Sequence, residues 1–249
     1  MSQISLIVWI LCFGLAVGTV EGDLDRPNVL FIAIDDLNTC PIGFDGSTTV
    51  DTPQISRLAE MGVKFTNAHC AAPACNPSRA AVMTGLAPAT TGVYLNTQDW
   101  RSNQVLVGRI TLPQHFRNHG YLALGGGKLY HGSTLSDGMY EGYLDASSWD
   151  HYFPSKTRQM PEEIDPPRVP MHSHVNFYRG HFDWARMDVP VDEMADAQVV
   201  NWACHQLSRD HEAPIFLAVG IYRPHIPWWT PGEYFDRHPI GGLELPETI

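Results

Sequence analysis

Apolar runs alternate with segments of helical periodicity along this chain. The continuous apolar runs at 28–34 and 214–219 are typical of strands covered on both faces in a parallel sheet. Shorter apolar runs predict further strands at 63–67 and 121–124, and helical spacing predicts helices at 53–61, 77–84, 111–119 and 191–207. Strands that alternate with helices indicate an α/β fold, with a mostly parallel central sheet flanked by helices.

Threonine, proline and glycine mark the ends of the predicted helices. Thr52 and Thr111 each precede a first turn that contains proline, as N-cap residues often do. Gly85 and Gly120 stand where a helix commonly ends in glycine. Residues 132–190 show no sustained period, so we expect them to form a long irregular excursion. In the helix predicted at 191–207, the apolar positions include Met194, Ala197, Val200, Trp202 and Leu207.

Polar residues follow the predicted strands at their carboxyl ends. Asp35 and Asp36 follow the first strand, Lys128 follows the strand at 121–124, and His225 comes after the last. The carboxyl ends of parallel strands meet at one edge of a sheet, which is where α/β proteins bind ligands. We therefore expect these side chains to converge on one site.

Composition argues against some classes of partner. The chain has 16 Lys and Arg against 27 Asp and Glu, a formal net charge of −11 over 249 residues. Nucleic acid is not expected as a partner, because nucleic-acid-binding proteins draw much of their affinity from a basic face. An anionic substrate must instead be held by a local cluster of positive groups. The length and the 44% of hydrophobic residues favour one domain with a sizeable core.

The first 22 residues are expected to be a secretory signal peptide, which leaves 23–249 as the folded domain. Residues 4–20 are apolar, and Gly18 and Gly22 offer small residues for cleavage. The run falls short of the roughly 20 residues that a membrane helix needs, so no stable membrane span is expected. An uncleaved anchor is the alternative, because the start lacks Lys and Arg. The protein is thus predicted to be exported to a periplasmic, secreted or lysosome-like compartment.

Four cysteines lie outside that segment, namely Cys40, Cys70, Cys75 and Cys204. They allow three complete disulfide pairings, among which the sequence does not choose. Cys75 precedes Pro77, which suits the first turn of a helix, so the cysteine would lie at a helix N-terminus. Free N–H groups and the helix dipole favour an anion there. Cys75 is therefore either part of an anion site or one half of a disulfide with Cys70 or Cys40.

Asp35 and Asp36 are candidate metal ligands. Two adjacent carboxylates repel each other unless a cation or an arginine lies between them, and oxygen ligands favour Ca²⁺ or Mg²⁺ over zinc. An Asp pair that opens a loop and caps a helix is the alternative. Arg79 lies one helical turn after Cys75 and can bind the same ligand through its guanidinium, unless it is an ordinary surface arginine.

Lys128 and His131 follow three consecutive glycines. Glycine lets the backbone approach a ligand closely, and the two side chains add a fixed charge and a titratable group. The spacing of a Walker A loop is absent. His225 lies in a proline-rich loop, where it is a candidate general acid or anion ligand, or a histidine packed against the tryptophans that follow.

These motifs together resemble the type I sulfatases of the alkaline phosphatase superfamily. The segment from Cys75 to Arg79 matches the family's Cys-x-Pro-Ser-Arg core, and Thr84 with Gly85 matches the Thr-Gly that follows it. Asp35 and Asp36 after an apolar strand match the family's opening. Among subgroups the chain is most similar to the iduronate-2-sulfatase group, through the segments 127–131, 216–220 and 223–227. Residues 23–249 are accordingly interpreted as a sulfatase N-terminal domain.

The resemblance implies that a maturating enzyme oxidises Cys75 to formylglycine during export. One hydroxyl of the aldehyde hydrate would attack the sulfur of a sulfate ester and release the alcohol, and the second hydroxyl would then expel the sulfate. The substrate would be a sulfated small molecule or saccharide. The family thus implies a sulfuric ester hydrolase.

The resemblance also implies roles for the other candidate residues. Asp35, Asp36 and residue 75 would hold Ca²⁺, which is favoured over Mg²⁺. Lys128 and His131 would bind the sulfate group, and the electrostatic stabilisation would come from these groups and the metal. The remaining roles would be stabilisation of the hydrate by Arg79, and binding of sulfate or protonation of the leaving oxygen by His225.

The chain departs from the family pattern in one respect. Family members complete the metal site with an Asp and an Asn or His from their second half, and no candidate for these groups follows His225. Two carboxylates alone leave Ca²⁺ under-coordinated. The chain is then a fragment of a longer protein, is completed by a second chain, or is a degenerate product. Two alternatives for the function stay open. One is a phosphoester or phosphonate hydrolase of the same superfamily, since some members with a similar cysteine motif cleave phosphorus esters, and the other is a truncated anion-binding remnant without activity.

Overall fold

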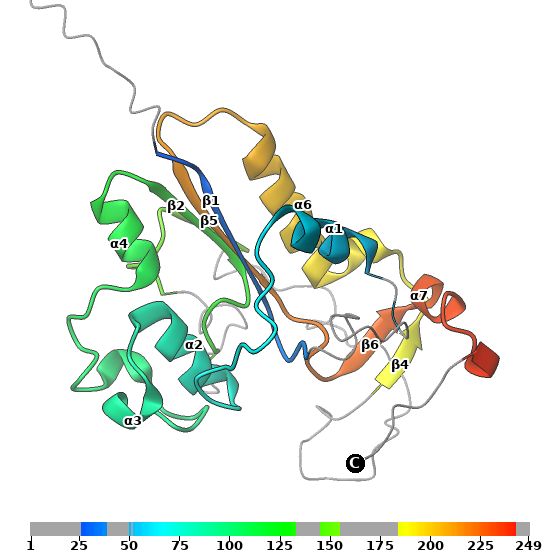
Figure 1. The fold of residues 1–249 in the computed structure, drawn as a ribbon, viewed down its shortest axis with the longest axis horizontal. Coiled ribbons are helices and arrows are strands. Elements are labelled where there is room, and N and C mark those ends of the chain that lie inside the picture. The colour runs from blue at the N-terminus through cyan, green and yellow to red at the C-terminus, as the bar shows by residue number, and fades with distance from the viewer. Residues whose placement is uncertain (1–25, 39–49, 51, 133–144, 155–183, 243–249) are drawn as a thin grey trace, which may run out of the picture.

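The central feature of the molecule is a four-stranded parallel sheet with helices on both faces (Figure 1). A computed structural model describes residues 26–38, 50, 52–132, 145–154 and 184–242; the expectations for the signal segment and for Cys40 lie outside them. The strand order is β1-β5-β2-β3, and all neighbouring pairs are parallel. A separate two-stranded sheet pairs β4 with β6. The predicted α/β architecture is confirmed.

The elements have the following bounds in the described part of the chain. The strands are β1 Val29–Ile34, β2 Leu122–Gly127, β3 His151–Phe153, β4 Trp184–Met187, β5 Ile215–Ile221 and β6 Trp228–Pro231. The α-helices are α1 Pro53–Met61, α2 Cys75–Thr84, α3 Pro88–Thr91, α4 Leu112–Asn118, α6 Ala195–Ser208 and α7 Gly232–Asp236. Short 3₁₀ helices are η1 Trp100–Ser102, η3 Val191–Glu193 and η4 Ile240–Gly242.

Local signals place the ends of α2 and α4 where the sequence predicts them. Thr111 caps α4 in a reciprocal capping box with Gln114, so two backbone donors at the helix start are satisfied. Gly85 ends α2 in the left-handed conformation, with φ of 72°, and donates its N–H to the carbonyl of Ala81 at 2.8 Å. Cys75 is the first residue of α2, so it lies at a helix N-terminus, as predicted.

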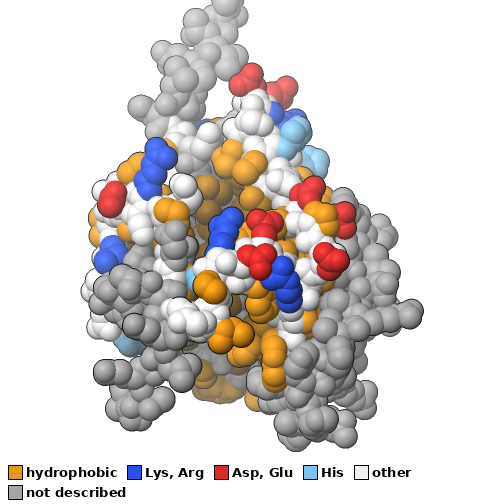
Figure 2. Space-filling view, turned by 90° about the vertical axis from the view of Figure 1, so that its right-hand side faces the viewer, with side chains coloured by type: hydrophobic (Ala, Val, Ile, Leu, Met, Phe, Trp, Pro, Cys, Tyr) orange, Lys and Arg blue, Asp and Glu red, His pale blue; other side chains and the backbone are white. Residues whose placement is uncertain are grey.

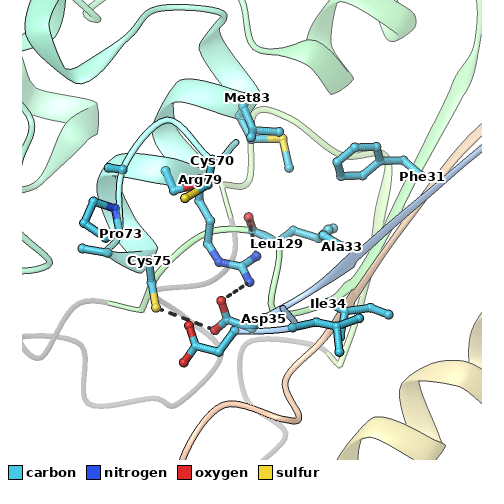
Figure 3. Close-up of a pocket in the computed structure, with 16 residues that line it drawn as sticks. Phe31, Ala33, Ile34, Asp35, Cys70, Pro73, Cys75, Arg79, Met83 and Leu129 are labelled. Atoms are coloured by element: carbon cyan, nitrogen blue, oxygen red, sulfur yellow. Dashed lines mark hydrogen bonds and ion pairs between the residues drawn. The ribbon is translucent and has the colours of Figure 1, made fainter. Parts of the chain in front are cut away.

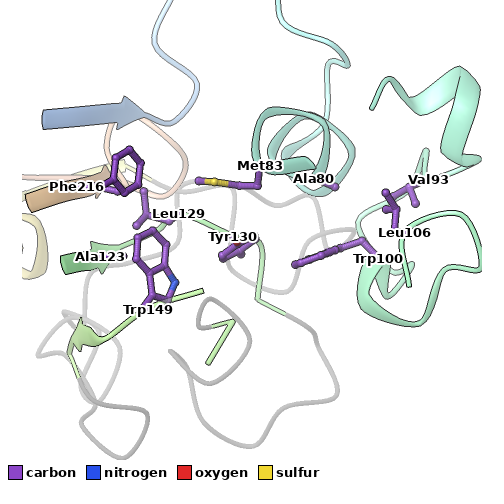
Figure 4. Packing of buried hydrophobic residues seen from close by; sticks show 11 residues of the cluster. Ala80, Met83, Val93, Trp100, Leu106, Ala123, Leu129, Tyr130, Trp149 and Phe216 are labelled. Atoms are coloured by element: carbon purple, nitrogen blue, oxygen red, sulfur yellow. The ribbon is translucent and has the colours of Figure 1, made fainter. Parts of the chain in front are cut away.

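Two apolar cores hold the sheet between its helices. On one face, Phe216 of β5 stacks on Phe116 of α4 with ring centroids 4.3 Å apart. Trp149 and Met83 belong to the same cluster as Phe216 (Figure 4). On the other face, Val199 and other residues of α6 pack against β2 and β5. The continuous apolar run of β5 is thus covered on both sides, as predicted for a buried parallel strand.

The outermost strand, β1, differs from this expectation because one of its faces is open. Leu30 and Ile32 lie on the same face of the sheet as the β5 residues that α6 covers, but they are 47% and 51% exposed. No described strand pairs with the outer edge of β1. Figure 2, which is turned by 90° from Figure 1, shows exposed hydrophobic side chains that lie between charged ones. The prediction that β1 is buried on both faces is therefore wrong for the described residues.

Other boundary predictions are also corrected. The strand predicted at 63–67 does not form, and Val63 and Phe65 are 81% and 79% exposed. The described part of the chain offers no neighbouring strand that would complete its hydrogen bonds. The predicted strand at 121–124 continues through the glycines to Gly127. Within the stretch expected to be irregular, the described residues form β3 and β4.

The helix predicted at 191–207 begins later, and only some of its predicted apolar positions are buried; Met194 is buried and Trp202 packs against the core. Residues 191–193 form η3, and α6 starts at Ala195. Of the predicted apolar positions, Val200 and Leu207 are 41% and 50% exposed. The residues of α6 that are buried include Val199 and Ala203. Among the described helices, none combines the length and the apolar character that crossing a membrane requires.

Phe216→Ala is expected to destabilise the fold by about 3–5 kcal/mol, because it leaves a cavity beneath α4. Leu58→Ala is a suitable control, since Leu58 is 61% exposed on α1 and its loss should change the free energy of unfolding by less than about 0.5 kcal/mol. Denaturant unfolding of both variants measures the difference. Similar losses for the two variants would contradict this assignment of the core.

Candidate active site at the carboxyl ends of the strands

Asp35, directly after β1, is the centre of a buried charge cluster. Its side chain lies at the sheet edge where β1 and β5 end, and its backbone N–H donates to the carbonyl of Ile221 at 3.0 Å. Arg79 of α2 contacts one carboxylate oxygen at 2.9 Å, and Lys128, just past β2, forms an ion pair with the other. Three separate elements therefore bring one carboxylate and two cations together, as the sheet topology predicted.

The ionisation of Asp35 depends on its two partners. Burial by itself would raise the pKa of this carboxyl, but the charges and hydrogen bonds of Arg79 and Lys128 lower it below its ordinary value. Asp35 is 7% exposed, Arg79 9% and Lys128 2%. One carboxylate and two cations leave a net positive charge in a protein that is acidic overall. The cluster is thus suited to binding an anion.

Arg79 also joins α2 to the segment after β2. One guanidinium nitrogen, Nη1, donates to the carbonyls of Lys128 and Leu129, the latter at 3.2 Å. The Nε of Arg79 is buried and has no hydrogen-bond partner within the described residues. Arg79 is therefore no ordinary surface arginine, and it retains one unused donor at the site.

Cys75 lies against the same cluster. Its Sγ is 3.7 Å from Oδ2 of Asp35 and 3.8 Å from Nζ of Lys128. Burial raises the pKa of the Cys75 thiol, and the lowering effect of Lys128 does not cancel this. The thiol is therefore predominantly protonated at neutral pH, which makes it a poor nucleophile in its own right.

The glycines before Lys128 make room for other protein atoms. A Cβ on Gly127 would lie 2.1 Å from the carbonyl oxygen of Gly220, and Gly127 has φ of +73°. Lys128 N–H donates to the same carbonyl at 2.9 Å. The expectation that these glycines admit a ligand is corrected, because a Cβ at each would meet protein atoms. Gly125 and Gly126 lie against the side chains of Trp149 and Trp202, and Gly127 lets β2 approach β5 and so fixes the position of Lys128.

His131 is half-buried beside the cations. Burial, followed by the charges of Lys128 and Arg79, lowers the pKa of His131 to about 4. Its Nδ1 is buried and, within the part of the chain that is described, has no hydrogen-bond partner. A neutral imidazole with a buried, unsatisfied nitrogen is a group that can bind a ligand oxygen.

His225 reaches the cluster from the turn that follows β5. Its Nδ1 contacts the carbonyl of Ile226 at 2.5 Å, and its Nε2 lies 3.8 Å from a carboxylate oxygen of Asp36. Burial, with Lys128 adding to it, lowers the pKa of His225. Its ring meets Tyr222 edge-on, with centroids 4.8 Å apart. His225 is thus directed into the site.

One group of potential metal ligands lies here. Ligand atoms of Asp35, Cys75 and His225 all lie within 4.8 Å of one another, whereas Asp36, adjacent to Asp35, has a side chain that is 57% exposed. The carboxylates are suitable for Ca²⁺, and residue 75 would add oxygen only after oxidation. The donors therefore fit part of a calcium shell, and further ligands are needed to reach six to eight oxygens.

A cavity of about 300 Å³ opens beside these groups (Figure 3). Its lining includes Asp35, Cys75 and Arg79 together with apolar side chains such as Phe31 and Met83. Cys70 also lines the cavity, a placement that its position in the sequence did not reveal. In the described structure Cys70, Cys75 and Cys204 carry free thiols, so Cys75 is not half of a disulfide there.

Comparison with known proteins agrees with this geometry. The family model described as Sulfatase matches residues 27–242. The chain belongs to the sulfatase family. The resemblance predicted from the Cys75–Arg79 motif is therefore confirmed, and the match extends over nearly all of the described residues.

Two relatives and one solved structure show how far the similarity of this sulfatase chain extends. A sulfatase from Formosa agariphila is 36% identical over 242 residues, which cover 91% of this chain and 45% of that protein. The iduronate 2-sulfatase of Homo sapiens is 30% identical over 251 residues, covering 97% and 43%. The phosphonate monoester hydrolase of Agrobacterium radiobacter shares the fold, with a TM-score of 0.64 at 22% identity, covering 88% and 45%. The chain spans less than half the length of these relatives.

Two site residues were missed by sequence reasoning. Asp196, in the first turn of α6, accepts hydrogen bonds from the backbone of Tyr222 and Arg223. Tyr222 in turn lies under the ammonium of Lys128, 4.2 Å from Nζ to the ring centroid. An acidic residue in a first helical turn is common for dipole reasons, so the sequence contains no signal that singles out Asp196.

Lowering the pH is expected to destabilise the chain through His131. Its folded pKa of about 4 lies below the ordinary value of 6.5, so the unfolded state binds the proton first. The stability is fully present above pH 6.5 and falls as the pH drops toward 4. In His131→Asn the free energy of unfolding should fall less across that window, as measured by denaturant titration in the presence of a chelator.

His115→Asn is the matched control for this experiment, because His115 is exposed on α4. It should retain the wild-type dependence of stability on pH. Equal slopes for wild type and His131→Asn would show that His131 does not carry the shift.

Proposed function

We propose that this chain is the N-terminal part of a formylglycine-dependent sulfuric ester hydrolase. The observation that supports it best is the placement of Cys75, at the N-terminus of α2 and within 4 Å of both Asp35 and Lys128. Because burial keeps the thiol protonated, attack by a thiolate is disfavoured. An aldehyde made from Cys75 avoids this obstacle, since its hydrate supplies an oxygen nucleophile at the same position.

The surrounding residues are suited to a sulfate group. Arg79 and Lys128 supply positive charge where the sulfate oxygens become more negative, and both are ordered before any substrate binds. Neutral His131 donates one N–H to a sulfate oxygen through a nitrogen that is otherwise unsatisfied within the described residues. Arg79, close to residue 75, stabilises its hydrate.

His225 is assigned to the leaving group. In the free protein its pKa is lowered, first by burial, so the ring is neutral near pH 7. An anionic ester bound beside it raises that pKa by charge attraction, and the protonated ring then donates to the departing alcohol oxygen or holds the sulfate. The same ring lies 3.8 Å from Asp36, a carboxylate that also favours the protonated form.

Asp35, Asp36 and residue 75 are proposed to hold Ca²⁺, in preference to Mg²⁺. The ion would supply additional positive charge at the sulfate oxygens. The ion needs further oxygen ligands. We assign them to sequence that corresponds to the part of the relatives that this chain does not cover. Lysine and arginine at Asp35 keep that carboxylate ionised and therefore able to coordinate a cation.

The proposed substrate is a sulfated saccharide or a similar sulfate ester. One relative is named an iduronate 2-sulfatase, and its name identifies a sulfated sugar acid as its target. Export through the signal segment at 1–22 and oxidation of Cys75 by a formylglycine-generating enzyme complete the proposal. Both steps belong together, because the maturating enzyme acts during export.

Oxidation of Cys75 is tested by expressing the chain with a formylglycine-generating enzyme and measuring the masses of its proteolytic peptides by mass spectrometry. The peptide that contains residue 75 is expected to have the mass of the aldehyde or its hydrate. Cys70 and Cys204 are internal controls that should keep their thiols. An unmodified thiol at residue 75 after coexpression would overturn the proposed chemistry.

The class of ester is tested on protein that also contains the sequence supplying the further metal ligands, by comparing an aryl sulfate, an aryl phosphate and an aryl phosphonate monoester, with Ca²⁺ present and Cys75→Ala as the control. Hydrolysis is expected for the sulfate and should be lost in the variant. Faster hydrolysis of the phosphorus esters would favour the other branch of the superfamily. Binding of inorganic sulfate without hydrolysis of any ester would instead identify an anion-binding remnant.

A further inference from the structure

The first turn of α6 is connected to the turn that carries His225. Asp196 is the second residue of α6, and its two carboxylate oxygens accept hydrogen bonds from consecutive backbone amides. Oδ1 accepts from the N–H of Tyr222 at 2.7 Å, and Oδ2 accepts from the N–H of Arg223 at 2.9 Å. This pair of hydrogen bonds ties the chain at the end of β5 to the first turn of α6.

The same short segment contacts two of the groups assigned to sulfate. The carbonyl of Tyr222 accepts the N–H of His225 at 3.0 Å, which closes the turn. The ring of Tyr222 lies 4.2 Å from Nζ of Lys128 and meets the ring of His225 edge-on. A change in the position of Tyr222 would therefore displace His225 and loosen the packing beneath Lys128.

Asp196 differs from an acid that merely stabilises a helix N-terminus. Such a residue interacts with the N–H groups of its own first turn, whereas both oxygens of Asp196 bond to another segment. Asp196 is half-buried, and burial raises the pKa of its carboxyl, with the two amide donors opposing the shift. Asp196 therefore contacts the turn of His225 although its own burial disfavours the charged form.

We infer that Asp196 is a positioning residue of the site, which acts through the Tyr222–His225 turn to hold the imidazole of His225 against Asp35 and Cys75. The consequence for catalysis rests on the proposed function. The positional effect does not, because it is a property of the folded chain alone. Asp196 itself has no place among the groups that contact the sulfate.

The positional effect is tested with Asp196→Asn, which keeps the size of the side chain but removes its charge and one acceptor oxygen. Asp192→Asn is the matched control, because Asp192 is an exposed acid just before the same helix. Hydrogen exchange resolved by NMR should rise about tenfold or more at the amides of Tyr222 and Arg223 in Asp196→Asn. Modification of His225 by diethyl pyrocarbonate, mapped by mass spectrometry, should also become faster.

The pattern of exchange separates positioning from general stability. In Asp196→Asn the amides within β5 and the body of α6 should exchange as in wild type, and Asp192→Asn should match wild type throughout. Wild-type exchange at 222 and 223 in Asp196→Asn, or an equal rise across β5 and α6, would overturn the inference. Asp196→Ser, which keeps a short acceptor, is used for the same measurement if the Asn variant does not fold.

A kinetic comparison, made on protein that also contains the sequence supplying the further metal ligands, tests the consequence for the reaction. If His225 assists the leaving group, Asp196→Asn and His225→Ala should both lower kcat more for an alkyl sulfate than for an aryl sulfate, with KM less affected. The double variant should be no slower than His225→Ala. Additive losses would show that Asp196 does not act through His225. Absence of all sulfate hydrolysis would contradict the proposed function, while the exchange and modification results would still decide the positional effect.

Discussion

The buried ion cluster of Asp35, Arg79 and Lys128 is the interaction on which the rest of the site depends. A buried carboxylate is costly unless it is paired, and the same holds for each of the two buried cations. Their pairing ties the end of β1 to α2 and to the segment after β2. The two cations are consequently ordered in the absence of a ligand, so an incoming anion meets a preorganised site without the cost of assembling it.

That cluster also determines the state of Cys75. The thiol lies between a carboxylate and an ammonium, and burial outweighs the attraction of the ammonium, so its pKa is raised. A cysteine activated as a thiolate would need the opposite balance. The surroundings instead suit a neutral oxygen nucleophile flanked by cations. The geometry around Cys75 and the family membership of the chain are both compatible with the proposed chemistry.

The sheet carries the site asymmetrically. β5 is the central strand, buried by α4 on one face and α6 on the other, and it positions both Gly220 and the turn of His225. β1 carries Asp35 but leaves Leu30 and Ile32 half-exposed. The residues with the firmest support are thus those that emerge from β2, β5 and α2. In the proposed function the anion is held on this better-supported side, and Asp196 of α6 ties down the turn that carries His225.

The sequence by itself determined the elements whose signals are local and the identity of the central motif. The apolar run of β5, the capping box at Thr111 and the glycine at Gly85 are each read within a few residues, and the motif from Cys75 to Arg79 identified the family. The tertiary structure decided what depends on distant neighbours. The strand predicted at 63–67 has no neighbouring strand among the described residues, and the glycines before Lys128 make room for other protein atoms. The role proposed for Asp196 depends on the turn that it contacts. Backbone pairing, burial and pKa shifts arise between segments far apart in the chain, so no local pattern encodes them.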